Sequence, residues 1–179
     1  MRIAIFVLFA LIPILPLFAQ VKLSDHRWIA VSNDFTNQLL KVELKHHPEQ
    51  GSRQGLREYD ELVSQPTRAD EDQERKEAED VVAKLKAALP EQRQKEIVQD
   101  LEIILRRAQL QFRMEDFERA HQVPFVNASM HVFLGLRILL DEQTPAERRP
   151  SAVVRIRRYA GLDPGYRAGL RRQIDVGRL

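Results

Sequence analysis

The sequence predicts an all-α protein, a single domain of about five helices that follows a signal peptide. Apolar residues recur at steps of three and four over most of the chain, which is the period of an amphipathic helix. Prolines and glycines separate these stretches. The alternation of apolar and polar residues that marks a half-buried strand is nearly absent.

The first nineteen residues are typical of a signal peptide. Arg2 gives a positive start, and an apolar run broken by only two prolines continues to Phe18. The small Ala19 suits signal peptidase, so we expect cleavage after it and a periplasmic or secreted protein. A membrane anchor is the alternative, but a spanning helix needs about 20 apolar residues. We therefore expect no permanent membrane span after cleavage.

The composition limits the chemistry and the partners. Removing Arg2 with the signal peptide leaves 27 of the 28 basic residues against 26 acidic ones, a net charge of +1. This near-neutral charge does not favour a nucleic-acid partner. The chain has no cysteine, which excludes disulfides, thiolate chemistry and cysteine-ligated metals. The remaining length suits one domain with a core of its own.

Residues 20–166 are predicted to form the helical domain, and residues 167–179 an irregular tail. The expected helices run from Ser24 to Pro48, from Thr67 to Leu89, from Glu91 to about Phe117, from Asn127 to Leu140 and from Thr144 to Gly161. Residues 51–64 are predicted to be a polar connector.

Capping residues support these boundaries. Thr67 with Asp70 three residues later resembles a capping box. Thr144 is expected to cap the last helix, with Pro145 at its first position. Gly161 suits the left-handed conformation that ends many helices.

The aromatic residues are expected in the core, because they lie at helical spacing; a hydrophobic ligand pocket is the alternative. They are Trp28, Phe35, Phe112, Phe117, Phe125, Phe133 and Tyr159. The fourth helix is expected to turn an apolar stripe inward. That stripe comprises Val132, Phe133, Leu136, Leu139 and Leu140.

Charge is unevenly distributed along the chain. Residues 70–80 are strongly acidic, whereas residues 148–178 contain nine arginines and only two carboxylates. One interpretation is that these are solvated helical faces that partly neutralise each other. The other is that the basic end contacts an acidic partner.

No catalytic, cofactor-binding or metal-binding residue can be assigned from the sequence. Zinc peptidases often place two histidines four residues apart with a glutamate between them, and no histidine pair here has this HExxH spacing. The nearest cluster, His46-His47-Pro48-Glu49, is interpreted as cations at a helix end, where the dipole favours them. No serine has the G-x-S-x-G context of a nucleophile.

An ordered set of short segments nevertheless resembles a known family. The segments are Trp28 with Ser32-Asn33, His47-Pro48-Glu49, Gly55, Glu58-Tyr59-Asp60, Asp100-Leu101-Glu102-Ile103 with Leu105, Pro124-Phe125, Val132-Phe133 with Gly135-Leu136 and Leu139-Leu140, Pro145-Ala146-Glu147-Arg148-Arg149, and the stretch from Val153 to Tyr166. In this order they resemble the N-terminal part of the bacterial family called domain of unknown function 885.

The resemblance implies a helical, exported protein related to zinc-dependent metallopeptidases. Members of the family are much longer, and their metal motif is an HExxPGH-type helix far downstream of the matched region. No family metal ligand or catalytic residue corresponds to a position here, so zinc is implied only for full-length relatives. The resemblance predicts a truncated family member that is inactive alone.

Three hypotheses about function follow from the sequence. The first is a non-catalytic relative of the metallopeptidases, whose last helices expose apolar faces where a missing C-terminal catalytic half would pack. The second is a free-standing periplasmic helical module that binds a peptide or another protein. The third is an enzyme in its own right.

Overall fold

A computed structural model describes residues 26–123 and 125–169. Within these ranges the chain forms six α-helices and short 3₁₀ turns, without a strand, which confirms the all-α fold class. The predicted signal peptide, residues 1–19, and most of the predicted tail, residues 167–179, lie outside the described residues.

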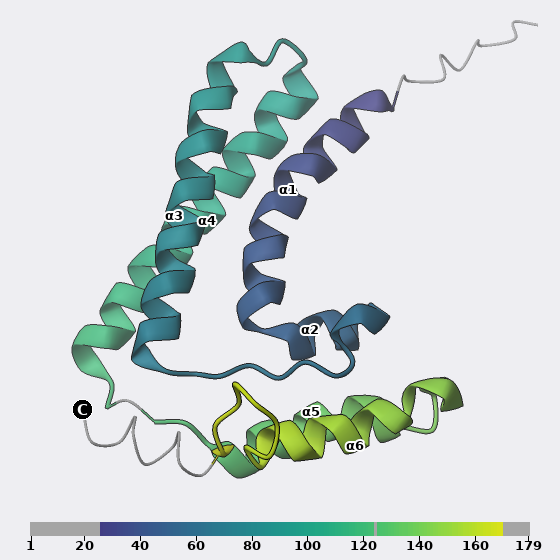
Figure 1. Ribbon diagram of the computed structural model, residues 1–179. Coiled ribbons are helices and arrows are strands. Elements are labelled where there is room, and N and C mark those ends of the chain that lie inside the picture. Colours follow the sequence, from purple (N-terminus) through teal and green to yellow (C-terminus); the bar gives the residue numbers. More distant parts are fainter. Residues whose placement is uncertain (1–25, 124, 170–179) are drawn as a thin grey trace, which may run out of the picture.

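Three long helices form the first of two regions, the helical bundle. They are α1 (Arg27–His46), α3 (Arg68–Ala88) and α4 (Lys95–His121). The turn η2 (Leu89–Glu91) joins α3 to α4, which run side by side in opposite directions (Figure 1). Helix α1 packs on both of them.

The shorter elements form the second region, the lower layer, below the bundle in Figure 1. They are α2 (Pro48–Arg53), η1 (Arg57–Tyr59), α5 (Ala128–Leu140), η3 (Ala146–Arg148) and α6 (Pro150–Tyr159). Helix α5 packs along α6 and also contacts α2.

The core of the bundle is apolar. Leu85 of α3 meets Leu101 and Leu105 of α4, and each of them is nearly or fully buried. Phe35 and Leu39 of α1 pack against this cluster. Burial of such side chains stabilises each by about 1.5–3 kcal/mol.

Several predicted helix ends are confirmed. The Thr67 hydroxyl accepts a hydrogen bond from the Asp70 amide at the start of α3. The Asn127 side chain accepts one from the Met130 amide at the start of α5. Gly161, with a φ of +72°, follows α6 in the left-handed region, as predicted.

Two predicted boundaries are wrong. The chain turns at His47 and resumes as α2 at Pro48, because a proline suits the first position of a new helix. The last helix begins at Pro150 rather than Pro145. The Thr144 hydroxyl does not cap it but donates to the Ile138 carbonyl at the end of α5.

Part of the predicted aromatic core is also wrong. Tyr159 is buried and Phe35 packs on the core, but Phe117, Phe125 and Phe133 are 61%, 70% and 57% exposed. Leu140, which was expected to face inward, is exposed as well. Helical spacing identifies a face of a helix, but it does not identify which face the rest of the fold covers.

The carboxylates of the acidic stretch on α3 pair with neighbouring helices of the bundle. Glu77 contacts His46 of α1, and Asp72 pairs with Arg119 of α4. In the reverse sense, Arg75 of α3 pairs with Glu115 of α4. None of the described ion pairs joins this stretch to residues 148–169. Contact of the basic end with an acidic partner stays a prediction.

Candidate interaction surface and buried polar network

The buried polar residues of the lower layer form the most concentrated group of titratable side chains. Glu49 of α2 is its centre. Its Oε1 accepts hydrogen bonds from the Ser64 amide at 3.0 Å, the Ser64 hydroxyl at 3.2 Å and the Tyr159 hydroxyl at 2.9 Å. His131 Nε2 lies 3.3 Å from the same oxygen.

This convergence changes the acidity of Glu49. Burial by itself raises the pKa of the carboxyl, but the hydrogen bond and positive charge of His131 and the Ser64 amide oppose it. Together they lower the pKa of Glu49 to about 2. Glu49 is therefore a charged carboxylate at neutral pH.

The cluster contains a serine, a histidine and a glutamate but lacks the geometry of a nucleophilic triad. His131 Nε2 contacts Ser64 Oγ at 3.0 Å, as a general base would. In a triad the carboxylate bonds the other ring nitrogen and orients the imidazole. Here Glu49 contacts the same Nε2 and the same hydroxyl. Ser64 is also buried, so its hydroxyl is not open to a substrate. The arrangement joins α2, the connector, α5 and α6 rather than activating the serine.

A second buried cluster joins η3 to α2. Arg148 donates to Asp60 from Nε at 2.8 Å and from a terminal nitrogen at 2.6 Å. The same guanidinium donates to the Ser52 carbonyl at 2.6 Å, and the Ser52 hydroxyl donates to Asp60. Burial opposes the charged form of Asp60, but these hydrogen bonds lower its pKa overall. This forked pairing fixes the orientation of η3 on α2.

Arg155 of α6 is fully buried and bonds only to backbone carbonyls in the described residues. It donates to Gly135 at 2.6 Å, to Tyr59 at 3.0 Å and to Leu62 at 3.2 Å. One side chain therefore satisfies carbonyls of α5, of η1 and of Leu62 in the segment that follows η1. Burial lowers the pKa of Arg155, while nearby carboxylates such as Glu49 oppose this effect.

The two histidines at the end of α1 contact the acidic face of α3. His46 is buried, with Nδ1 at 2.8 Å from Asp70 and Nε2 at 3.3 Å from Glu77. His47 lies 3.0 Å from Glu74, and this hydrogen bond raises its pKa. The two rings meet different carboxylates of α3 and thereby tie the end of α1 to that helix. No group of three or more metal-ligating side chains suited to a metal ion occurs within residues 26–123 and 125–169.

The outer face of α5 carries a stripe of exposed apolar side chains. Its residues recur at steps of three and four on the side opposite the buried Ala128, Gly135 and Leu139. They are Met130, Phe133, Leu134, Arg137 and Leu140, and the four apolar ones are 51%, 57%, 40% and 54% exposed. Both faces of α5 are thus apolar, which is typical of a helix covered on all sides.

Helix α6 carries a shorter exposed stripe. Val153 and Ile156 are 62% and 50% exposed and share a face with Arg149 and Arg157. The sequence prediction that the last helices expose apolar faces agrees with this arrangement.

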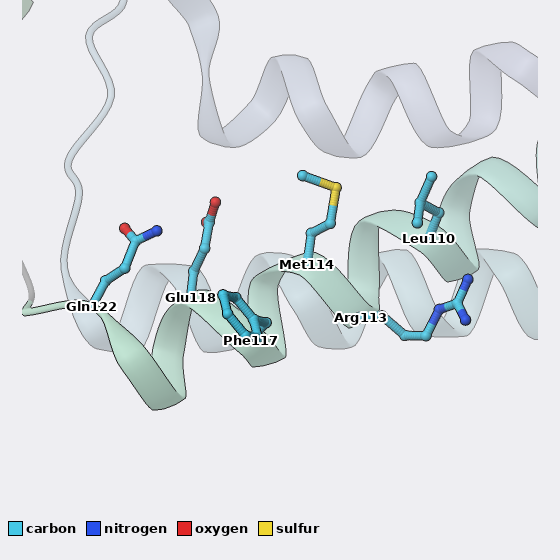
Figure 2. A pocket seen from close by; sticks show the side chains of 6 residues that line it. All are labelled: Leu110, Arg113, Met114, Phe117, Glu118 and Gln122. Carbon is cyan, nitrogen blue, oxygen red and sulfur yellow. The ribbon is translucent and has the colours of Figure 1, made fainter.

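A groove of about 520 Å³ follows the C-terminal half of α4. Figure 2 shows Leu110, Met114, Glu118 and Gln122 in a row along one side of the helix. Arg113 and Phe117 complete the lining. Its apolar lining is exposed to solvent at Leu110, Met114 and Phe117.

Comparison with known proteins adds no relative. No protein-family model, no curated protein and no solved structure matches the chain. Among the described residues, none of the helices combines the length and the apolar composition needed to cross a membrane.

Sequence reasoning missed the roles of Ser52 and Ser64, because single polar residues in a predicted connector look solvated. It missed the role of Arg155 as well, although Arg155 lies in the stretch from Val153 to Tyr166 that carries the resemblance. A signal existed for others. Glu49, Asp60, Arg148 and Tyr159 all belong to the segments that carry the family resemblance, and in the structure they form the two buried clusters.

Proposed function

We propose that this protein is an exported, non-catalytic helical module that docks on another polypeptide through the outer face of α5. In this proposal it corresponds to the N-terminal portion of the metallopeptidase-like family that it resembles. The partner takes the position of that family's C-terminal half, or of a separate chain.

One observation carries the proposal, namely that α5 is apolar on both faces. Its inner face packs on α6 and α2, and its outer face exposes four large apolar side chains on 13 residues. Exposed apolar patches of this kind mark interaction surfaces. The residues behind the resemblance support the same proposal, since they build the layer that holds α5 in place.

Export is supported by the sequence of residues 1–19 alone. Mass spectrometry of the protein recovered from the periplasm of a bacterial host is expected to show a chain beginning at Gln20. A chain that keeps Met1 would contradict the export part of the proposal.

The docking part is tested with an uncharged amphipathic helical peptide that carries leucines on one face. Binding is measured by fluorescence anisotropy on protein purified after expression of the whole sequence. Phe133→Ser is expected to weaken binding about tenfold, the effect of losing one well-buried anchor. Phe117→Ser is the matched control, because Phe117 is equally exposed but lies on α4. Unchanged binding by Phe133→Ser would overturn the proposal.

The groove on α4 favours a second candidate function, a free-standing module that binds an apolar ligand there. The same experiment separates the two functions. The alternative predicts that Phe117→Ser weakens peptide binding and that Phe133→Ser does not. In either case we expect no zinc-dependent cleavage of denatured casein, because neither surface holds a catalytic group.

A further inference from the structure

The two helices that present the exposed stripes are strongly one-sided in charge. Between them, α5 and α6 contain four arginines and no carboxylate. Three of the four have partners, because Arg155 bonds backbone carbonyls, and Arg157 and Arg158 pair with Asp163. The fourth, Arg137, is exposed, and no carboxylate of the described residues pairs with it.

Arg137 lies within the apolar outer face of α5 rather than at its border. It comes four residues after Phe133 and three before Leu140 on the same side of the helix. Anything that covers the apolar side chains also removes water from this guanidinium. A buried arginine without a partner is strongly unfavourable, so the covering surface must bring a carboxylate or an equivalent acceptor.

We infer that the outer face of α5 docks an acidic amphipathic helix, with one carboxylate of that helix paired to Arg137 and apolar side chains on either side of it. This inference rests on the proposed function and specifies its partner. The exposed Arg149 beside the stripe of α6 favours additional acidic residues on the same partner.

Two other occupants fit this surface less well. In a symmetric dimer through α5, the two copies of the surface would face each other, and the two Arg137 side chains near their centres would repel. An interfacial membrane helix keeps its basic residues on the polar face and its apolar residues on the other. Arg137 instead interrupts the apolar face itself.

The test compares three synthetic helical peptides with identical leucine faces that differ at one central position, which is Glu, Gln or Lys. Wild-type protein is expected to bind the Glu peptide about tenfold more tightly than the Gln peptide and to bind the Lys peptide most weakly. Arg137→Glu is expected to reverse the order. Arg107→Glu, which changes an exposed arginine of α4, is expected to leave the order unchanged.

Equal binding of the Glu and Gln peptides would overturn the inference, as would an unchanged order in Arg137→Glu. The proposed function would survive either result if Phe133→Ser still weakened every peptide. If the protein sedimented with phosphatidylglycerol vesicles and bound none of the three peptides, the surface would be assigned to a membrane instead. A dimer in analytical ultracentrifugation that Phe133→Ser dissociates would assign it to a second copy. Both results overturn the inference.

Discussion

The bundle and the lower layer are held together by different forces. Where α1, α3 and α4 meet, the buried contact consists of leucines, with phenylalanine and valine around them. In the lower layer, two arginines, two carboxylates and the groups that bond them are buried beside apolar residues such as Leu139 and Ala152. Both regions expose apolar side chains, along the C-terminal half of α4 in the bundle and along the outer face of α5 in the lower layer.

The comparison indicates that the two regions tolerate change differently. Hydrophobic contact is non-directional, so a bundle core accepts side chains of similar volume. A buried guanidinium needs every acceptor in place, and removal of one partner leaves the others unpaired. The lower layer is therefore the less tolerant region, although it supplies the proposed docking surface.

The largest expected effect is on the arginine that spans the lower layer. Arg155→Ala leaves the carbonyls of Gly135, Tyr59 and Leu62 without their donor and is expected to cost roughly 4 kcal/mol of unfolding free energy. Leu101→Ala, at an equally buried position of the bundle, is expected to cost about 3 kcal/mol. Urea denaturation followed by circular dichroism measures both. A smaller loss for Arg155→Ala than for Leu101→Ala would contradict the comparison.

The next effect depends on pH and comes from Glu49. Its pKa falls from the ordinary 4.5 to about 2 in the fold, so its stabilising contribution is complete above pH 4.5 and is lost as the pH falls toward 2. The loss is expected to be about 3 kcal/mol. Urea denaturation between pH 7 and pH 2 gives the unfolding free energy of wild type and of Glu49→Gln. The change of their difference with pH measures this loss. Glu102→Gln, at an exposed carboxylate, is the control, and parallel profiles for wild type and Glu49→Gln would contradict the prediction.

A smaller effect tests the close approach of α5 and α6. A Cβ at position 135 would fall on the Tyr159 hydroxyl, so Gly135→Ala is expected to cost about 2 kcal/mol although alanine favours helices. Thermal unfolding gives the cost in wild type and in a Tyr159→Phe background. The cost is expected to shrink in that background, because the hydroxyl is gone. Stabilisation by Gly135→Ala would show that the helices are farther apart.

The smallest effect is expected on the surface of the bundle. Arg68 lies 3.7 Å from Glu71 and 3.8 Å from Asp72, and all three side chains are about half exposed. Exposed pairs of this kind contribute little, so Arg68→Ala is expected to change the unfolding free energy by less than about 0.5 kcal/mol. A loss comparable to that of Arg155→Ala would mean that charge holds the bundle together as well.

The sequence predicted the helices of the bundle better than those of the lower layer. Each of the three long helices lies where the sequence predicts a helix, and their apolar residues at steps of three and four meet in the Leu85, Leu101 and Leu105 core. In the lower layer, the sequence predicts only that the first helix ends at Pro48, whereas Pro48 is also the first residue of α2. Phe133 was placed inside, because periodicity cannot tell an inner face from an outer one when a helix is apolar on both.

The sequence by itself determined the all-α class, most helix ends and the absence of recognisable catalytic motifs, because these depend on neighbours within a few residues of each other. Only the tertiary structure decided which polar residues are buried. Ser52, Asp60 and Arg148 are separated by up to 96 residues, and it is the fold that brings them within hydrogen-bonding distance. It also decided that the outer face of α5 is left exposed, since exposure depends on which neighbours are present.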